Sequence, residues 1–258
     1  MLSIVIPAYN EADRLPATLD MTLDYFGDDS RSYEVIVVDD GSSDDTVKEV
    51  RRFASRSSNI RLIRLPQNFG KGFAVRSGII NAEGDRVLFM DADGATPMTE
   101  LAALESVMTE TAAEIVIGSR SHREGTDTVV RAKWIRHIAG RTFHQFVRIL
   151  GVAGISDTQC GFKLFSRDAA TAIATRMRMR GFSFDVEMLW IGRGLGFQIR
   201  EVPINWTHMP GSKVNVVRDG VRMVADLVRI RRNSIRGAYQ LGRKLTPTIN
   251  VPVIDAER

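Results

Sequence analysis

The amino-acid sequence predicts an α/β fold in which a mostly parallel sheet is flanked by helices. Over the first 120 residues, short runs rich in β-branched side chains alternate with stretches of helical periodicity. Strands separated by helices of this length form right-handed βαβ units. Several of the runs also end in polar side chains, as strands do where a ligand binds at the carboxyl edge of an open sheet.

The expected elements of this region follow one another in regular alternation. Strands are expected at residues 2–7, 33–40, 60–65, 85–93 and 113–120, and helices near 11–26, 43–57, 70–82 and 98–111. Three strands end in polar clusters, at residues 8–11, 39–42 and 91–93. Because the carboxyl ends of parallel strands share one edge, these clusters should meet in a single cleft.

The alternation stops after Arg120. We expect a basic amphipathic helix over 131–150, a loop-like stretch over 157–170, a strand within 198–206 and a second basic amphipathic helix over 219–236. Leu245–Arg258 is expected to be a flexible tail. The chain is therefore expected to comprise one catalytic domain, residues 1–217, and an extension, residues 218–258, that contains the second basic helix and the tail.

Composition excludes several classes of protein. The chain has 258 residues, a net charge of +4 and one cysteine, so it has no disulfide framework. It has neither the pattern of a signal peptide nor an apolar run of the roughly 18 residues that cross a bilayer. Positive charge is concentrated in residues 120–148 (net +5) and 218–244 (net +6). This asymmetry indicates either polyanionic partners or solvated helix faces.

Two carboxylates, Asp91 and Asp93, directly follow the apolar run Val87–Met90. At a turn the pair can share one divalent ion, and Mg²⁺ and Mn²⁺ prefer such oxygen ligands together with substrate phosphates. Asp-x-Asp alone is a weak signal, because loops are rich in aspartate. The cluster at 39–42 also permits a reading as a turn and a helix cap. The position of both clusters at strand ends is the stronger indication of a site.

Several blocks of the sequence resemble family 2 glycosyltransferases. They are Ile6–Glu11, Val38–Asp44, Asn68–Gly72, Met90–Gly94, Ile117–Arg120, Asp157–Lys163, Phe184–Glu187 and Trp206–Lys213. Within that family the chain is most similar, from about residue 2 to 217, to the polyprenyl-phosphate (dolichyl-phosphate) hexose synthases of the glucosyltransferase branch. The resemblance implies a GT-A fold, a nucleotide-sugar donor, a divalent metal and inversion at the anomeric carbon.

The resemblance also implies roles in donor binding. Pro7, Tyr9 and Glu11 would border the nucleotide base and ribose. Asp39 would hold the uracil side, and Asp91 would hold the ribose or the metal. The diphosphate would lie against three further side chains: Lys71, Ser212 and Lys213.

Asp93 would be the principal ligand of a Mg²⁺ or Mn²⁺ ion that neutralises charge on the departing diphosphate. Asp91 would share this ion. His208 could be a third ligand or a hydrogen-bond donor behind the ligands, and the sequence favours neither.

The nature of the acceptor follows from its ionisation. A sugar hydroxyl needs a general base, whereas a lipid phosphate is already largely ionised at pH 7 and needs cations to hold it. In the enzymes that the chain resembles, Arg120 and Arg141 would hold the lipid phosphate, with Arg131 a weaker candidate. Asp185 and Glu187 occupy the block where family members that act on hydroxyls keep their base. Here they could instead orient arginines or sugar hydroxyls.

The sequence therefore predicts an inverting transferase that moves a hexose, with glucose from UDP-glucose as the first choice, onto a polyprenyl phosphate. One alternative is a hydroxyl acceptor with Asp185 or Glu187 as base, and another is GDP-mannose as donor. A nucleic-acid-binding module would use the basic helices but would not explain the carboxylates at the strand ends, so no nucleic-acid partner is expected.

The two basic amphipathic helices predict peripheral contact with the inner, cytoplasmic face of the cell membrane, where a polyprenyl acceptor resides. Their apolar faces could equally pack on the domain or form a dimer seam. The sequence leaves the oligomeric state open.

Overall fold

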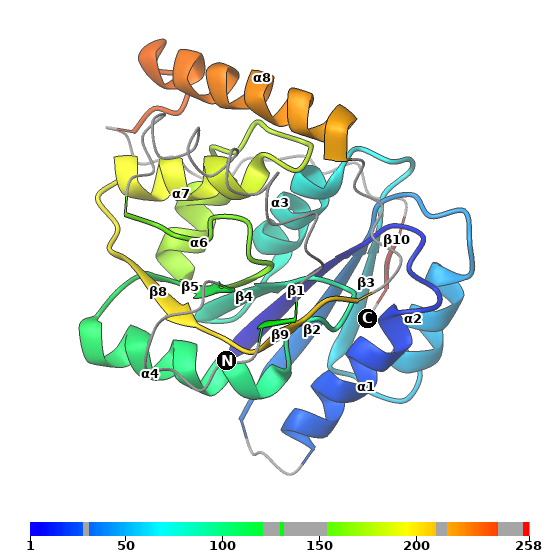
Figure 1. Ribbon diagram of the computed structural model, residues 1–258. Coiled ribbons are helices and arrows are strands. Elements are labelled where there is room, and N and C mark those ends of the chain that lie inside the picture. The colour runs from blue at the N-terminus through cyan, green and yellow to red at the C-terminus, as the bar shows by residue number, and fades with distance from the viewer. Residues whose placement is uncertain (28–30, 121–129, 132–153, 210–215, 242–254, 258) are drawn as a thin grey trace.

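A computed structural model describes residues 1–27, 31–120, 130–131, 154–209, 216–241 and 255–257. Within these ranges an eight-stranded sheet has the order β10-β3-β2-β1-β4-β7-β5-β8. Helices cover both faces of this sheet, so the molecule has three layers (Figure 1). The strands β6 (Val130–Arg131) and β9 (Trp206–Thr207) form a separate parallel pair.

The first half of the sheet has the expected alternation. Its strands are parallel to one another, with β1 next to both β2 and β4 and with β3 next to β2. They are β1 (Leu2–Ala8), β2 (Tyr33–Asp39), β3 (Ile60–Arg64) and β4 (Arg86–Met90). The intervening helices are α1 (Leu15–Phe26), α2 (Thr46–Ala54) and α3 (Lys71–Asn81). The helix expected over 98–111 begins as the 3₁₀ turn η1 (Met98–Glu100) and continues as α4 (Leu101–Thr111).

The second half of the sheet mixes strand directions. β7 (Phe162–Ser166) lies between β4 and β5 (Ile115–Ser119) and is antiparallel to both. β8 (Ile199–Pro203) then pairs with β5 in parallel. Two helices, α6 (Arg167–Ala174) and α7 (Phe184–Gly194), connect β7 to β8. The sheet is therefore mostly parallel, as predicted, with one reversed strand near its centre.

The loop-like interpretation of residues 157–170 is wrong. This stretch contains β7, one of the central strands, and the beginning of α6. Lys163 interrupts the apolar pattern of β7, which is why the sequence does not look like a buried strand. The lysine is nevertheless fully buried, because its ammonium group pairs with Asp185 of α7. A charged residue can occupy such a position only with a partner that neutralises it.

Two other segments bear on the expected elements. The helix predicted over 131–150 does not include Arg131, which lies in β6, and residues 132–150 are outside the described part of the chain. At the other end, Asp255–Glu257 form β10, antiparallel to β3, where we expected a flexible tail. The prediction of a second helix is confirmed by α8 (Val216–Ile235). Among the described residues, no helix is both long enough and apolar enough to span a membrane.

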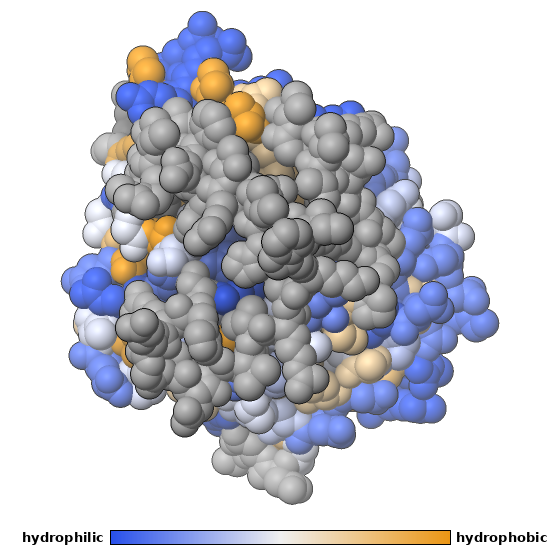
Figure 2. All heavy atoms as spheres, viewed as in Figure 1, coloured by the Kyte–Doolittle hydropathy of each residue, from blue (hydrophilic) through white to orange (hydrophobic). Residues whose placement is uncertain are grey.

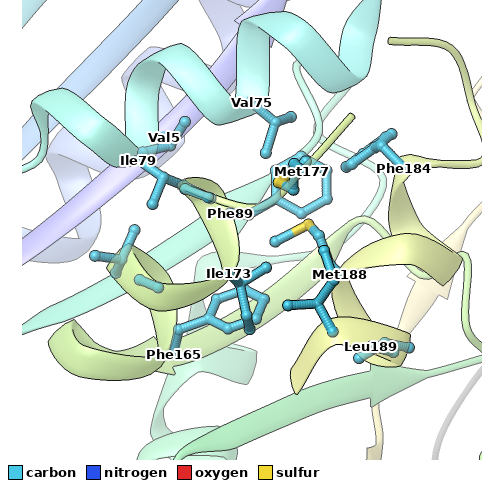
Figure 3. Packing of buried hydrophobic residues seen from close by; sticks show 14 of the residues in the cluster. Val5, Val75, Ile79, Phe89, Phe165, Ile173, Met177, Phe184, Met188 and Leu189 are labelled. Carbon is cyan, nitrogen blue, oxygen red and sulfur yellow. The ribbon is translucent and has the colours of Figure 1, made fainter. Parts of the chain in front are cut away.

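Alternating side chains of the strands build a core on each face of the sheet. On one face, Val5 and Phe89 pack with α3, α6 and α7, and Figure 3 shows Val75, Ile79 and Phe184 meeting there. On the other face, the neighbouring strand residues pack against α1, α2 and α4. Residues buried on both sides explain why these strands are continuous apolar runs. The polar side chains are consequently displaced to the strand ends.

Candidate active site

The loops that follow β1 and β2 are joined by hydrogen bonds at the carboxyl edge of the sheet. Ala8, the last residue of β1, is in register with Asp39, the last residue of β2. Beyond them, the backbone N–H of Asn10 donates to Ser42 Oγ at 2.8 Å, and the N–H of Ser43 donates to Asn10 Oδ1 at 2.8 Å. The first two polar clusters therefore meet, as the sequence predicted.

Two adjacent buried carboxylates end β2. Asp39 accepts the backbone N–H of Ser42, and burial raises its pKa. Asp40 accepts the N–H groups of Phe69 and Gly70, at 2.8 and 2.9 Å, and burial raises its pKa to about 6. Asp40 thus holds the loop that leads into α3. The sequence analysis gave Asp40 no role of its own.

Lys71 begins α3 and reaches the end of β4. Its ammonium Nζ lies 2.7 Å from Asp91 Oδ1. Burial lowers the pKa of Lys71, but Asp91 and Asp185 together outweigh that effect and raise it. The lysine is therefore a permanent cation in a cluster of carboxylates. A cation at a helix N-terminus is unfavourable unless anions surround it.

Asp91 and Asp93 both line a small hollow. Its lining consists of Met90, Asp91, Asp93, Ala95, Thr96, Gly161, Phe162 and Trp206. The backbone N–H of Asp91 donates to Gly161 O at 3.0 Å. A Cβ atom at position 161 would lie only 2.1 Å from Asp91 Oδ2, so this contact requires glycine. The pKa of Asp93 is raised by burial and by the negative charge of Asp91.

The carboxylate pair fits a divalent cation in its chemistry. Repulsion between Asp91 and Asp93 is the kind of interaction that a shared ion relieves, and both offer the oxygen ligands that Mg²⁺ and Mn²⁺ prefer. In the described ranges, however, no three His, Cys, Asp or Glu side chains gather as a ready-made metal site. His208 instead has its ring 6.1 Å from that of Trp206, centroid to centroid.

Arg120 directly follows β5 and forms a bidentate ion pair with Asp157. Its Nε and Nη2 atoms lie 2.7 and 2.8 Å from the two carboxylate oxygens, and the backbone N–H of Arg120 also donates to Asp157. The guanidinium carbon lies 5.4 Å from the centroid of the Trp206 ring. These contacts fix Arg120 beside Trp206, which lines the hollow.

Asp185, in the first turn of α7, is almost fully buried and pairs with Lys163. Lys163 also donates to the backbone carbonyl of Cys160. Burial raises the pKa of Asp185, and the positive charges of Lys163 and Lys71 oppose that rise. The carboxylate is thus held between two lysines.

Glu187 lies two residues further along α7, in the same first turn, and is fully buried. Its carboxylate accepts hydrogen bonds from the backbone N–H groups of Arg178 and Met179 and from the hydroxyl of Tyr239. All three donors belong to the protein itself. Asp185 and Glu187 therefore have different surroundings, although only one residue separates them.

A comparison with known protein families shows which family the chain belongs to. A model described as Glycosyl transferase family 2 matches residues 3–173, which is about two thirds of the chain. The chain belongs to glycosyltransferase family 2. It is therefore a glycosyltransferase, and the polar edge of the sheet, where the matched strands end, is its candidate active site.

Relatives within family 2 cover most of the chain. The dolichyl-phosphate beta-glucosyltransferase of Dictyostelium discoideum is 42% identical over 250 residues, which are 93% of this chain and 76% of the relative. The human protein of the same name is 38% identical over 93% of this chain and 78% of its own length. The protein of that name from Saccharomyces cerevisiae is 36% identical over 94% and 78%.

Solved structures show the same fold at low sequence identity. Glucosyl-3-phosphoglycerate synthase from Mycobacterium tuberculosis, in complex with UDP, superimposes with a TM-score of 0.65 at 18% identity over 90% of this chain and 80% of that one. Mannosyl-3-phosphoglycerate synthase from Rubrobacter xylanophilus has a TM-score of 0.64 at 19% identity, covering 97% and 78%. The mycobacterial enzyme has also been crystallised with Mn²⁺, UDP-glucose and phosphoglyceric acid (TM-score 0.65, 19% identity, covering 90% and 80%). The fold is the GT-A fold that the sequence predicted.

The structure brings together most of the predicted donor-site residues of this family 2 enzyme. Pro7 is the second-last residue of β1, and Tyr9 is exposed just beyond the strand. Glu11 forms a bidentate ion pair with Arg14. Arg14 in turn approaches Asp93, 3.9 Å away. The roles assigned to these residues stay predictions.

Four predicted residues cannot be placed by their side chains. Arg141, Ser212 and Lys213 lie outside the described residues, and Arg131 is described only through the backbone of β6. The sequence analysis also missed the partners Asp157 and Lys163. Both lie in the block Asp157–Lys163, which resembles the family, but nothing in a linear pattern shows which charge each would meet.

Proposed function

We propose that this enzyme transfers glucose from UDP-glucose to a dolichyl-type polyprenyl phosphate, with inversion, to give a β-linked lipid-phosphate glucose. The names of the relatives support the sugar and the acceptor. UDP and UDP-glucose in the structures of the mycobacterial relative support the donor, and its Mn²⁺ supports a divalent metal.

On the donor side, Asp93 and Asp91 would hold Mg²⁺ or Mn²⁺, with His208 as a further candidate. When bound, the ion supplies positive charge against the diphosphate leaving group. Lys71 is already fixed 2.7 Å from Asp91, so it adds a second cation on the same side. Asp39 and Tyr9, on neighbouring loops, border the expected place of the base and ribose.

The observation that carries the choice of acceptor is the burial of Asp185. A base that deprotonates a sugar hydroxyl must come within hydrogen-bonding distance of it. The side chain of Asp185 is only 7% exposed and is bound to Lys163. Glu187, the other candidate base, is occupied by three donors from the protein. This arrangement favours an acceptor that is already ionised, such as a phosphate with a second pKa of about 6.

Cations on the acceptor side suit that phosphate. Arg120 lies beside Trp206, which lines the hollow, and is oriented by Asp157. A planar guanidinium can bind phosphate oxygens in pairs. We include Arg141 and Arg131 in the proposed acceptor site because of the family resemblance. Their positive charge would align the phosphate for attack on the anomeric carbon.

The exposed face of α8 supports contact with a membrane. Met223, Leu227 and Ile230 are buried in the protein, whereas Val224 (37% exposed), Val228 (58%) and Ile235 (78%) form an exposed stripe along one flank of the helix. The exposed arginines of α8 and the residue after it are Arg222, Arg229, Arg231, Arg232 and Arg236. In Figure 2, hydrophobic and hydrophilic residues adjoin along the top of the molecule, where Figure 1 shows α8.

Such a face can place its apolar side chains at the acyl boundary while its arginines meet anionic headgroups. A polyprenyl acceptor remains in the bilayer, so its transferase must work at that surface. We therefore propose peripheral attachment at the cytoplasmic face of the cell membrane.

The direct test is a transfer assay with radiolabelled UDP-glucose, UDP-galactose and GDP-mannose against dolichyl phosphate, with dolichol as the control acceptor. We expect alkali-stable glucolipid only from UDP-glucose and dolichyl phosphate, and only with Mg²⁺ or Mn²⁺ present. Transfer to dolichol, or to a soluble sugar in preference to the lipid phosphate, would contradict the proposed acceptor. Preference for GDP-mannose would contradict the proposed donor.

Membrane contact is tested by flotation with vesicles that contain phosphatidylglycerol. Binding should weaken with salt and in the double variant Arg229→Glu, Arg232→Glu. The control is Arg56→Glu, an exposed arginine beyond α2. Equal binding of all three proteins would exclude α8 as the contact.

A further inference from the structure

Glu187 is a buried carboxylate that does not line the hollow. Its two oxygens accept the N–H of Arg178 (2.9 and 3.0 Å), the N–H of Met179 (2.8 Å) and the hydroxyl of Tyr239 (2.8 Å). Burial raises the pKa of Glu187, and these donors oppose the rise. An ionised carboxylate can accept hydrogen bonds but cannot donate them. It therefore matches a site made entirely of donors.

The backbone segment that Glu187 binds, Arg178 to Arg180, contacts the first turn of α3. Arg180 O accepts the N–H of Gly72 at 2.7 Å. A Cβ atom at Gly72 would lie 2.5 Å from Met179 O, so the two segments are in close contact. Lys71 stands immediately before Gly72. Its position therefore depends on the segment from Arg178 to Arg180.

The other side of Glu187 is closed by the chain that follows α8. Tyr239 has no exposed surface, although 52 residues separate it from Glu187. Close to it, Arg178 Nη2 donates to Ala238 O at 2.9 Å. The next residues of α7, Met188 and Leu189, point into the core beside Met177 in Figure 3. Glu187 is thus held on a rigid element, and Tyr239 fixes one of its oxygens.

We propose that Glu187, together with Tyr239, is a positioning residue for Lys71. Through the backbone of Arg178 to Arg180 it keeps the first turn of α3 in place, so that the lysine ammonium stays on the diphosphate side of the cleft. This inference rests on the proposed function only in assigning Lys71 to the diphosphate. It gives Glu187 a role different from that of a general base.

The test is a double-mutant cycle on UDP affinity, measured by calorimetry in the presence of Mn²⁺. Tyr239→Phe removes one hydrogen bond to Glu187 and keeps the ring. We expect UDP to bind about three- to tenfold more weakly, a change of about 1 kcal/mol. In the Lys71→Ala background, the same substitution should have no further effect on UDP affinity.

The control is Tyr33→Phe. Tyr33 is the first residue of β2, at the end of the strand away from the carboxyl edge, and it stacks on Phe26. It should leave UDP affinity unchanged. Glu187→Gln is the second variant, because its amide NH₂ would face backbone N–H donors. It should weaken UDP binding more than Tyr239→Phe does, with a smaller change in the KM for lipid phosphate than in that for UDP-glucose.

Unchanged UDP affinity in Tyr239→Phe would overturn the inference, and so would an equal loss in the presence and absence of Lys71. If the wild-type protein bound no UDP, the proposed donor would be wrong. These two failures are therefore distinguishable. Thermal unfolding of each variant shows whether it is folded at the temperature of the titration.

Discussion

The proposed donor side and the proposed acceptor side of the site hold most of their carboxylates in different ways. On the donor side, Asp40 and Asp93 accept backbone N–H groups of nearby loops, at Phe69, Gly70 and Ala95. On the acceptor side, Asp157 and Asp185 are held by the side chains of Arg120 and Lys163. On the donor side Lys71 also pairs with Asp91 at 2.7 Å, and Arg14 lies 3.9 Å from Asp93. On the acceptor side each carboxylate has a close cation of its own, so that arrangement is close to neutral.

This difference corresponds to two chemical tasks. A site for a metal ion and a diphosphate needs carboxylates that remain available for the cation. A site for an anionic acceptor needs oriented cations, and the paired carboxylates orient them at the cost of being unavailable as bases. The reversed strand β7 makes the second arrangement possible, because it brings Lys163 into the centre of the sheet.

The largest effect should come from the donor side. Asp93→Ala should lower turnover by about 1,000-fold, or roughly 4 kcal/mol of barrier, because the leaving group loses the countercharge of the metal. Asp93→Asn should be almost as poor. The measurement is glucolipid formation at saturating donor, with Asp168→Ala, an exposed carboxylate of α6, as the control. Retention of more than about a tenth of the activity would contradict the metal role.

Removing the buried cation of the acceptor side should lower the stability of the protein. Lys163→Met leaves Asp185 buried without its partner, which should lower the free energy of unfolding by about 3 to 5 kcal/mol. Chemical denaturation provides the measurement. Lys48→Met, which breaks an exposed pair with Asp45 at 3.9 Å, is the control and should cost less than about 0.5 kcal/mol. Similar losses of unfolding free energy in the two variants would show that the buried pair stabilises the fold no more than an exposed one does.

The stability of the fold should depend on pH through Asp40 on the donor side. Asp40 has a folded pKa of about 6 against 3.8 for the free side chain, so the folded state binds its proton more tightly. Its contribution to stability is therefore greatest at low pH and is lost as the pH rises from about 4 through 6, by roughly 2 to 3 kcal/mol. Urea unfolding between pH 4.5 and 7 measures this slope. Asp40→Asn should flatten it, and an unchanged slope would assign the titration to another group.

The smallest effect should be specific for the acceptor. Arg120→Ala should raise the KM for lipid phosphate about tenfold, equivalent to roughly 1.4 kcal/mol, and leave the KM for UDP-glucose nearly unchanged. Arg120→Lys should rescue this only in part, because lysine lacks the planar fork. Steady-state kinetics with Arg200→Ala as the exposed control checks this result. An equal rise in both KM values would remove Arg120 from the acceptor site.

The convergence of the polar clusters on the donor side was predictable because each cluster directly follows a recognisable apolar run. Asp39, Asp91 and Asp93 each follow an apolar run, and parallel strands bring their ends to one edge. Lys71 was assigned to the diphosphate from the resemblance of the block Asn68–Gly72 to the family. The acceptor side was not predictable to this extent. Its pairs join residues 22 and 37 positions apart, and one member of each pair was assigned without its partner.

The sequence by itself determined the α/β class, the polar ends of the strands and the helix α8, because these depend on local periodicity and on the spacing of apolar residues. Tertiary structure alone decided that Lys163 lies in a central strand and that Glu187 binds Tyr239. The physical reason is that burying an apolar side chain is favourable almost wherever the core is. A buried charge, by contrast, is stable only beside a particular partner, which the chain supplies from a distant position.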